Sequence, residues 1–341
     1  MKKFFGVIGN PPYQEEVVGN GRANPIYNHF MNESYQVGER VELITPARFL
    51  FNAGQTPKAW NQQMLDDRHL KVLHYNPNGE EVFSNAEIKG GIAVTYRDAT
   101  TEFGSVGTFI PFDELAMIIT KVNSSSDSFL AEMVTGAVPY RFTDDVRKDY
   151  PECIELIGSS FDLRTNILDK LNGRMFYKTA PSDGEEYSLI FGLVNKSRDY
   201  LWVNRRYIET PDNFERFKVF LPKASGNGDY GEALAECVIG EPKTGHTQSF
   251  ISIGSFFTEE EAKALSYYIK TKFARSLLGV LKVTQDITSR VWANVPLQDF
   301  TPHSDIDWSQ SIPEIDQQLY AKYGLTQEEI DFIESHVKEM S

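Results

Sequence analysis

Residues 4–13 read Phe-Phe-Gly-Val-Ile-Gly-Asn-Pro-Pro-Tyr, a short apolar run that leads directly into an asparagine and two prolines. The run from Phe4 to Ile8 has the length and composition of a buried strand. Two consecutive prolines fix their own φ and push the residue before each of them into extended backbone. The pattern predicts a strand that ends at a rigid, extended loop carrying Asn10 and Tyr13.

The loop Asn10-Pro11-Pro12-Tyr13 suits the chemistry of an amine attached to an aromatic ring. The lone pair of that nitrogen is delocalised into the ring, and acceptors on both N–H groups draw the nitrogen toward a tetrahedral, more nucleophilic geometry. The side-chain oxygen of Asn10 supplies one acceptor and the carbonyl of Pro11 supplies the second. Tyr13 offers an aromatic face to a base that has left its stack. The alternative interpretation is a rigid turn without chemistry.

The composition indicates a globular chain. Its 341 residues leave room for two domains with cores of their own. The two cysteines, Cys153 and Cys237, provide neither a disulfide framework nor metal-ligand spacing, which fits a reducing cytoplasm. Neither a signal peptide nor an apolar run of membrane-spanning length is visible. The sequence therefore predicts a soluble, cytoplasmic protein without a membrane partner.

The net charge of −14 is unevenly distributed along the chain. Residues 301–341 hold nine acidic and two basic residues, which is half of the net charge. Residues 196–223 carry a local charge of +3, and residues 263–290 carry +5. Basic segments inside an acidic chain are compatible with one cationic face, although such runs are often solvated surface. The charge pattern therefore permits binding to nucleic acid without requiring it.

Residues 1–105 alternate short strands with helices. Further strands are predicted at residues 41–44, 71–75 and 91–96, and helices are predicted after residue 24 and over residues 57–65. This alternation is typical of an α/β sheet.

The motifs in this part resemble the second half of the catalytic domain in gamma-type adenine methyltransferases, particularly the Eco57I-like restriction-modification enzymes. The resemblance rests on Asn10-Pro11-Pro12-Tyr13, on Val41-Glu42-Leu43-Ile44-Thr45-Pro46 with Arg48-Phe49-Leu50, and on Glu81-Val82-Phe83 followed by Ile92-Ala93-Val94-Thr95-Tyr96.

The resemblance implies N6 methylation of adenine in double-stranded DNA by base flipping, at the nucleoid, within a partial Rossmann-like methyltransferase sheet. It assigns Asn10, Pro11 and Pro12 to orienting the amine and Tyr13 to stacking on the base. It also makes Phe83 a second stacking residue, for which the alternative is an ordinary core aromatic.

The family binds S-adenosylmethionine through a glycine-rich loop with Asp or Asn and Pro, placed well before this motif. Nine residues precede Asn10, and the later glycine clusters at 104–107, 226–228 and 253–255 are more typical of turns. We therefore expect no cofactor loop in this polypeptide, and a second polypeptide that supplies the cofactor-binding half is a candidate partner. In that case the strand over residues 4–8 leaves an open sheet edge.

Residues 106–300 are predicted to form an α+β target-recognition region. Alternating patterns over residues 187–203 and 217–221 predict antiparallel strands, and Thr258 is predicted to cap a helix that continues beyond residue 273. Residues 251–297 resemble the end of this region in the same enzymes, which implies phosphate contacts from Lys and Arg. The candidate DNA-binding residues are Arg205, Arg206, Lys270, Lys272, Arg275, Lys282 and Arg290. For each of them the alternative is solvated surface.

Residues 301–341 form an acidic tail with two predicted helices that meet near Gly324, the second one capped by Thr326. Because this tail is acidic, we expect it to pack on the protein or dock a partner rather than contact a duplex.

Two rival functions remain open at this point. Without a cofactor loop, the chain could be a non-catalytic DNA-recognition subunit or remnant. A restriction endonuclease is the other rival, because Pro211-Asp212 followed by Glu241-Pro242-Lys243 has the letter pattern of a metal-dependent nuclease site. The sequence otherwise predicts no metal site.

Overall fold

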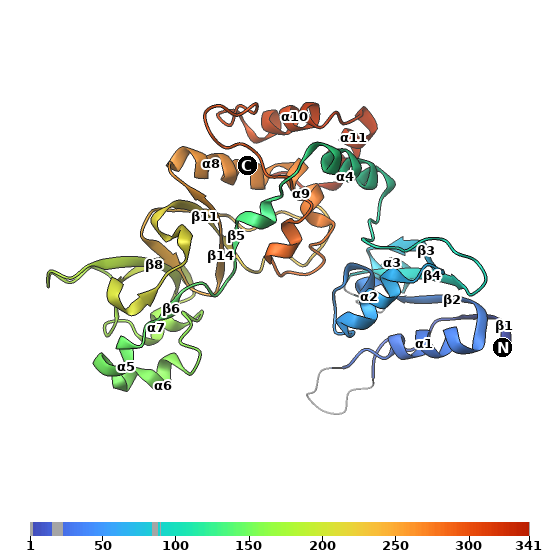
Figure 1. Ribbon diagram of the computed structural model, residues 1–341, viewed down its shortest axis with the longest axis horizontal. Helices are drawn as coiled ribbons and strands as arrows, with labels where there is room; N and C mark the ends of the chain where they lie inside the picture. The colour runs from blue at the N-terminus through green and yellow to red at the C-terminus, as the bar shows by residue number, and fades with distance from the viewer. Residues whose placement is uncertain (1–2, 16–22, 84–87, 89, 341) are drawn as a thin grey trace. The chain divides into compact units, whose positions relative to one another are not determined.

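The computed structural model describes residues 3–15, 23–83, 88 and 90–340, and the chain forms two compact units (Figure 1). Unit 1 contains Met1–Ala116 and Asn227–Asp229, and unit 2 contains Met117–Gly226 and Tyr230–Ser341. The domain boundaries expected from the sequence, at 105/106 and 300/301, separate regions of different expected function. They stay a prediction.

Unit 1 is built on a mixed four-stranded sheet with strand order β1-β2-β4-β3. Its strands are β1 (Phe4–Gly9), β2 (Gly38–Pro46), β3 (Leu70–Asn76) and β4 (Ile92–Asp98). β1 runs parallel to β2, whereas β4 is antiparallel to both β2 and β3. The helical elements are α1 (Tyr27–Val37), η1 (Ala47–Phe51), α2 (Lys58–Asp66) and α3 (Gly79–Val82). The α/β character predicted for this part is confirmed.

An aromatic cluster forms the centre of unit 1. Tyr27 from α1, Phe49 from η1 and Trp60 from α2 lie with ring centroids 5.3 to 6.3 Å apart, and all three are buried. The indole of Trp60 donates a hydrogen bond to Asn32 Oδ1 at 2.9 Å, so its polar atom is satisfied inside the core. Each ring buries a large apolar area, and together they fix η1 against the two helices.

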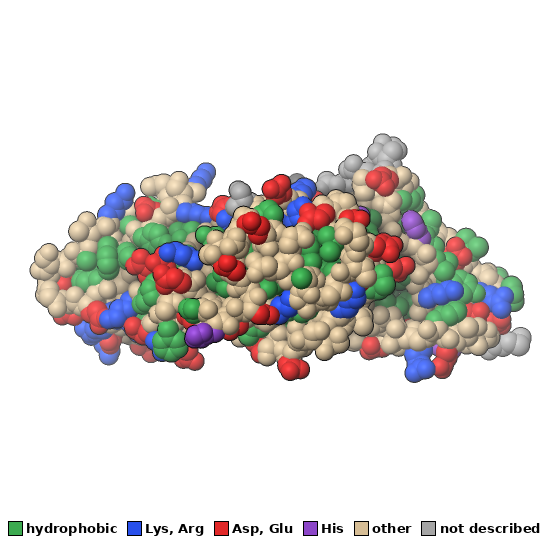
Figure 2. All heavy atoms as spheres, turned by 90° about the horizontal axis from the view of Figure 1, so that it is seen from above, with side chains coloured by type: hydrophobic (Ala, Val, Ile, Leu, Met, Phe, Trp, Pro, Cys, Tyr) green, Lys and Arg blue, Asp and Glu red, His purple; other side chains and the backbone are tan. Residues whose placement is uncertain are grey.

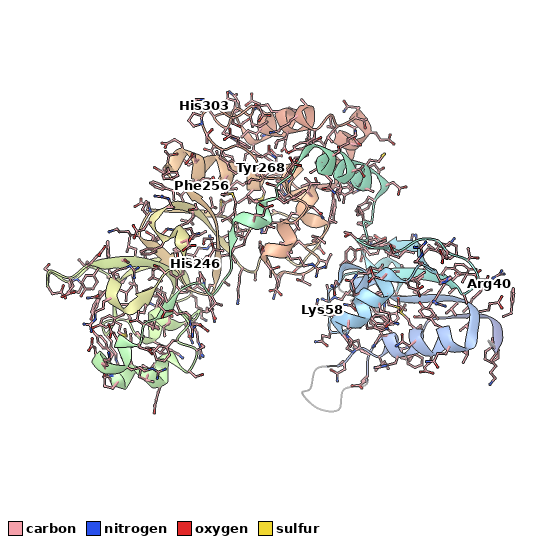
Figure 3. All side chains as sticks on the ribbon, viewed as in Figure 1. Arg40, Lys58, His246, Phe256, Tyr268 and His303 are labelled. Atoms are coloured by element: carbon pink, nitrogen blue, oxygen red, sulfur yellow. The ribbon has the colours of Figure 1, made fainter. Side chains whose placement is uncertain are left out.

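Strand β1 exposes apolar side chains on both of its faces. The exposed fractions of Phe4, Phe5 and Ile8 are 49%, 69% and 83%. Among the residues that the structure describes, β1 pairs with β2 alone. Arg40 on β2, labelled in Figure 3, covers the ring of Phe5 at 4.8 Å. An edge strand with this much exposed apolar surface is a site for pairing with another strand.

Unit 2 contains two four-stranded sheets, in the orders β12-β11-β14-β5 and β13-β8-β9-β7, and a two-stranded sheet of β10 and β6. The longer strands are β8 (Tyr187–Val194), β9 (Ser197–Asn204), β11 (Phe217–Pro222) and β14 (Phe250–Phe256). The short ones are β5 (Val134–Thr135), β6 (Arg141–Phe142), β7 (Phe176–Tyr177), β10 (Ile208–Glu209), β12 (Val238–Gly240) and β13 (Thr244–His246). Most of the pairings are antiparallel, which confirms the predicted antiparallel, β-rich pattern.

The capped helix predicted at Thr258 is confirmed as α8 (Glu259–Lys270), where Thr258 and Glu261 form a capping box. The expected continuation of that helix beyond residue 273 is wrong, because α8 ends at Lys270 and Thr271 separates it from the next helix. The Thr271 hydroxyl donates to Tyr268 O at 2.7 Å and accepts from the N–H of Ala274, so it caps a separate helix, α9 (Lys272–Gly279).

The other helices were less visible in the sequence. α4 (Asp113–Ser125) was not predicted, and α7 (Ile167–Lys170) is a single turn. Further short helices are α5 (Asp145–Asp149) and α6 (Ile154–Ile157), and 3₁₀ turns occur at η2 (Leu130–Met133), η3 (Pro151–Cys153), η4 (Arg205–Tyr207), η5 (Asp212–Glu215) and η6 (Ser289–Trp292). None of the helices within the described ranges is long and apolar enough to cross a bilayer.

The acidic tail is an integral part of unit 2. Its helices are α10 (Ile312–Lys322) and α11 (Gln327–His336), which pack against α8 and α9. The buried carboxylate of Asp316 accepts hydrogen bonds from the first two backbone N–H groups of α9, those of Lys272 at 3.0 Å and Phe273 at 2.8 Å. A carboxylate at a helix N-terminus satisfies unpaired N–H groups and complements the helix dipole. The tail therefore caps the helix on which it lies.

Candidate functional site

The loop Asn10-Pro11-Pro12-Tyr13 directly follows β1 at its carboxyl end, beside the parallel strand β2. The carbonyl of Tyr13 accepts from Ile26 N at 3.1 Å, and Glu15 N donates to Asn24 O at 2.9 Å. These two bonds tie the loop to the segment that enters α1. Ligands in open α/β sheets bind outside the carboxyl ends of the strands, and the loop occupies that position.

The loop forms one wall of a pocket of about 820 Å³. All its lining residues belong to unit 1, and they are mostly neutral, with prolines, amides and two tyrosine rings. They are Asn10, Pro11, Pro12, Tyr13, Gln14, Ala23, Pro25, Tyr27, Pro46, Arg48, Gly54, Gln55 and Ile88. A mostly uncharged pocket of this size with a few polar groups is suited to a flat heterocycle.

Phe83 lies beside Tyr13, with ring centroids 6.4 Å apart and ring planes at 74°. The structure thus brings together the two aromatic residues that the sequence assigned to stacking. Their arrangement is edge to face, so the two rings do not present parallel faces to a common base. A base that stacks on Tyr13 meets the side of Phe83, and a sandwich requires one ring to turn.

Burial raises the pKa of Tyr13, and the side chain of Asn10 offsets part of this effect. Burial also raises the pKa of Tyr27 to about 12, with smaller opposing effects from Thr56 and from the positive charge of Arg48. Both phenols are therefore neutral near pH 7. The hydroxyl of Tyr13 is buried near the side chain of Asn10, and it forms no hydrogen bond of good geometry with a residue that the structure describes.

Arg48 is a functional candidate that sequence reasoning missed. It belongs to the Arg48-Phe49-Leu50 motif, but the motif alone did not indicate a function for its side chain. Its guanidinium lines the pocket, and its buried Nε has no partner within the described part of the chain. Its position two residues after Pro46, at the end of β2, was the available signal, because residues at strand ends face the ligand edge of such a sheet.

The pocket lining bears on whether S-adenosylmethionine binds here. Among the lining residues that the structure describes, none is a carboxylate that could bind the ribose hydroxyls or the amino group of the cofactor. No group of three metal-ligating side chains occurs in the parts of the chain described by the structure. The described lining residues therefore do not fit the cofactor.

Arg275 and Lys282 are withdrawn as DNA contacts because both are buried, with exposed fractions of 2% and 3%. The guanidinium of Arg275 donates to the carbonyls of Lys270, Glu232 and Lys338, and Lys282 forms an ion pair with Glu232. Buried cations need such partners, since desolvation is costly. Their role is to stabilise unit 2 by joining segments that are distant in sequence.

The other five basic candidates lie closer to solvent, but four of them are engaged. Arg205 bonds to Thr210 at 2.9 Å. Arg206 bridges Asp145 at 3.0 Å and Asp149 at 3.2 Å, while Lys270 pairs with Glu236 at 3.1 Å and Lys272 with Glu334. Arg290 is exposed and has no acidic partner among the residues that are described. On the face of unit 2 drawn in Figure 2, basic side chains are interspersed with acidic ones.

The fold places two parts of the nuclease pattern, Lys243 and the turn that starts at Asp212, close together. Lys243 N donates to Phe214 O at 2.9 Å, next to the η5 turn that starts at Asp212. The Lys243 ammonium is paired with Glu186 at 2.7 Å rather than with a residue of the pattern. These contacts describe a turn stabilised by a surface ion pair.

Residues 1–83 match the Eco57I restriction-modification methylase family. This match confirms the resemblance read from the motifs and supports a methyltransferase role for this part of the chain. No curated protein matches the chain.

Two solved structures are similar to the chain. One is the type IIG restriction endonuclease BpuSI, at 10% identity and a TM-score of 0.35, covering 93% of this chain and 50% of that one. The other is the type IIL restriction-modification enzyme MmeI in complex with DNA, at 10% identity and a TM-score of 0.37, covering 97% and 56%. The chain thus spans about half the length of the structures that it matches.

Proposed function

We propose that this chain is a component of a site-specific DNA adenine-N6 methyltransferase of a restriction-modification system, acting on adenine flipped out of double-stranded DNA. One observation carries the proposal. Asn10-Pro11-Pro12-Tyr13 forms a wall of a mostly uncharged pocket at the carboxyl end of a parallel strand, with Phe83 beside Tyr13. The family match covers all of these residues.

The chain's own residues act on the amine of the base. Asn10 Oδ1 and the carbonyl of Pro11 accept its two N–H bonds, which localises the lone pair on nitrogen. Pro11 and Pro12 keep these acceptors extended before the base arrives, so little reorganisation is needed. A preorganised pair of acceptors also selects against a base without an exocyclic amine, because the acceptors would stay unpaired.

Tyr13 supplies the face on which the flipped base stacks. Its buried hydroxyl can donate to the sugar. Phe83 lies edge to face with Tyr13 and is not among the pocket-lining residues that the structure describes. Since stacking on an aromatic side chain stabilises a bound base by about 1 to 3 kcal/mol, loss of the Tyr13 ring should weaken base binding more than loss of Phe83.

The methyl donor is S-adenosylmethionine by family resemblance, and we place its binding site outside this pocket. The edge of β1, with exposed Phe4, Phe5 and Ile8, is where a further part of a Rossmann-like sheet would pair. That part could belong to the same longer protein or to a second polypeptide. DNA, in the cytoplasm at the nucleoid, is the other partner, and residues 106–300 are proposed to recognise the target with Arg290 at the phosphate backbone.

A non-catalytic DNA-recognition subunit is the second candidate. It is favoured by one observation: none of the lining residues that the structure describes is a carboxylate that could hold the cofactor. Under this function the acceptor pocket is inherited from an enzyme but no longer supports transfer.

Calorimetric titration of the purified chain with S-adenosylmethionine, with and without duplex DNA, separates these functions. DNA binding with methylation lost in Asn10→Ala supports the methyltransferase. DNA binding without cofactor binding supports either a recognition subunit or an enzyme that needs its cofactor-binding part. Addition of that part then decides, because only the enzyme gains N6-methyladenine in digested DNA. An absence of DNA binding contradicts both functions.

A further inference from the structure

Among the pocket-lining residues that the structure describes, Arg48 carries the one formal charge, a positive one. Its Nε is buried without a partner, and its side chain forms no ion pair, among the residues that the structure describes. An adenine base is uncharged and does not account for this cation. A buried guanidinium N–H without a partner is costly, and an anionic ligand at the same guanidinium would offset that cost.

Two glycines hold the stem of Arg48 in this position. A Cβ at Gly90 would lie 2.7 Å from Arg48 Cγ, and a Cβ at Gly54 would lie 3.3 Å from Arg48 Cβ. Both glycines have positive φ, +83° and +85°, which other residues rarely adopt. The arginine stem therefore lies in a channel that only glycine leaves open, and its guanidinium is directed rather than free to sample solvent.

The loop after η1 is fixed by a chain of hydrogen bonds. Thr56 Oγ1 donates to Asn61 Oδ1 at 2.7 Å, and Asn61 Nδ2 donates to Asn52 Oδ1 at 3.2 Å. The N–H of Ala53 returns to the carbonyl of Arg48 at 3.0 Å. Thr56 and Asn61 are fully or almost fully buried. The cation is thus part of a built wall of the pocket.

We propose that Arg48 binds a phosphate of the nucleotide whose base occupies the Asn10 to Tyr13 wall. This inference rests on the proposed function, since it takes the ligand to be a flipped nucleotide. A nucleotide carries an uncharged base and an anionic phosphate joined through one sugar, and the pocket offers acceptors and a ring on one wall and a guanidinium on another. Arginine matches phosphate oxygens with two parallel N–H bonds. Arg48 is therefore a positioning residue that fixes the sugar-phosphate while Asn10 and Pro11 hold the amine.

The test is a titration of the isotope-labelled full chain, followed by NMR, with deoxyadenosine and with its 5′- and 3′-monophosphates. One monophosphate should bind about three- to tenfold more tightly than the nucleoside, the range of a partly exposed charge-assisted hydrogen bond. Arg48→Met should abolish that difference and leave the affinity for deoxyadenosine unchanged. Lys58→Met is the matched control, because Lys58 begins α2, as Figure 3 shows, and bonds the same loop at Asn52 O without lining the pocket.

A second variant guards against misfolding of Arg48→Met. Arg48→Lys keeps a charge on a straight stem but cannot form two parallel bonds, so it should retain only part of the preference for phosphate. Methionine and inorganic phosphate serve as further probes. Binding of methionine that depends on Arg48 would show that the anion is a carboxylate, which overturns the phosphate assignment.

Failure of this inference is distinguishable from failure of the proposed function. Equal binding of nucleoside and monophosphates, or a preference that survives in Arg48→Met, overturns the role of Arg48 while the adenine pocket stands. If deoxyadenosine does not bind and Asn10→Ala changes nothing, the proposed function fails. In that case Arg48-dependent binding of the monophosphate still supports a phosphate site, and its absence removes both.

Discussion

Replacing Arg275 by Met tests whether this cation stabilises unit 2 or contacts DNA. The guanidinium donates to the carbonyls of Lys270 at 3.1 Å and Glu232 at 3.3 Å and also to that of Lys338, and 2% of the residue is exposed. Burial lowers its pKa to about 10, so it stays charged near neutral pH. Methionine fills the stem volume but leaves three carbonyls without this donor.

The expected loss follows from these contacts. A buried polar group that loses its partner costs about 1 to 3 kcal/mol, and the relief of a buried charge offsets part of the total. We therefore expect Arg275→Met to lower the unfolding free energy of unit 2 by about 3 kcal/mol. Lys272→Met is the control on the same helix, because its ion pair with Glu334 is closer to solvent and contributes about 0 to 1 kcal/mol.

Urea unfolding followed by tryptophan fluorescence provides the measurement. Trp202, Trp292 and Trp308 lie in unit 2 and Trp60 lies in unit 1, so variants with single tryptophans assign each transition to a unit. Loss of stability in Arg275→Met no larger than in the Lys272→Met control would refute the structural role. A weaker salt dependence of DNA binding at unchanged stability would restore Arg275 as a phosphate contact.

Three further predictions concern other features of the fold. Burial raises the pKa of Asp316 from 3.8 to about 6, so the folded protein holds a proton that the unfolded chain has released, and stability falls as the pH rises from about 4 to about 6. That shift corresponds to about 3 kcal/mol; unfolding at several pH values should show this fall relative to Asp316→Asn, and parallel pH profiles would contradict it. Thr258→Ala removes the capping box of α8 and should cost unit 2 about 1 kcal/mol, measured by the same unfolding assay; no change would mean that the helix start is held by its packing. Ile8→Lys places a charge on the β1 edge, where 83% of Ile8 is exposed, and should reduce self-association in sedimentation velocity without loss of stability; association that persists would point to another surface.

Local signals were sufficient for much of the fold. Thr258 with Glu261, and Thr326 with Glu329, marked helix starts that the structure confirms as capping boxes. The strands of unit 1 were equally visible, because their apolar runs are short and are bounded by turn residues. The prediction of one long helix was wrong at Thr271. The hydroxyl of this residue bonds to the backbone of both α8 and α9, a contact that the apolar pattern of the sequence does not indicate.

Partners distant in sequence could not be predicted. Lys282 was read as a DNA contact because its acidic partner, Glu232, lies 50 residues earlier in the chain. Lys272 likewise meets Glu334 of the tail, 62 residues later. The positive charges that form a local surplus in the sequence are therefore neutralised by ion pairs in the folded protein, since ion pairing depends on tertiary proximity. The candidate role of Arg48 was missed for the same reason, because it depends on the position of this residue where β1 and β2 end side by side.

The most direct test of the acceptor pocket compares deoxyadenosine with the deoxyriboside of purine, which lacks only the exocyclic amine. NMR titration of the full chain requires neither a cofactor nor the recognition sequence. Two hydrogen bonds to Asn10 and Pro11 should favour deoxyadenosine by about tenfold or more, and Asn10→Ala should reduce that preference. Equal affinity for the two nucleosides, unaffected by Asn10→Ala, would contradict the claim that this loop holds the amine of adenine.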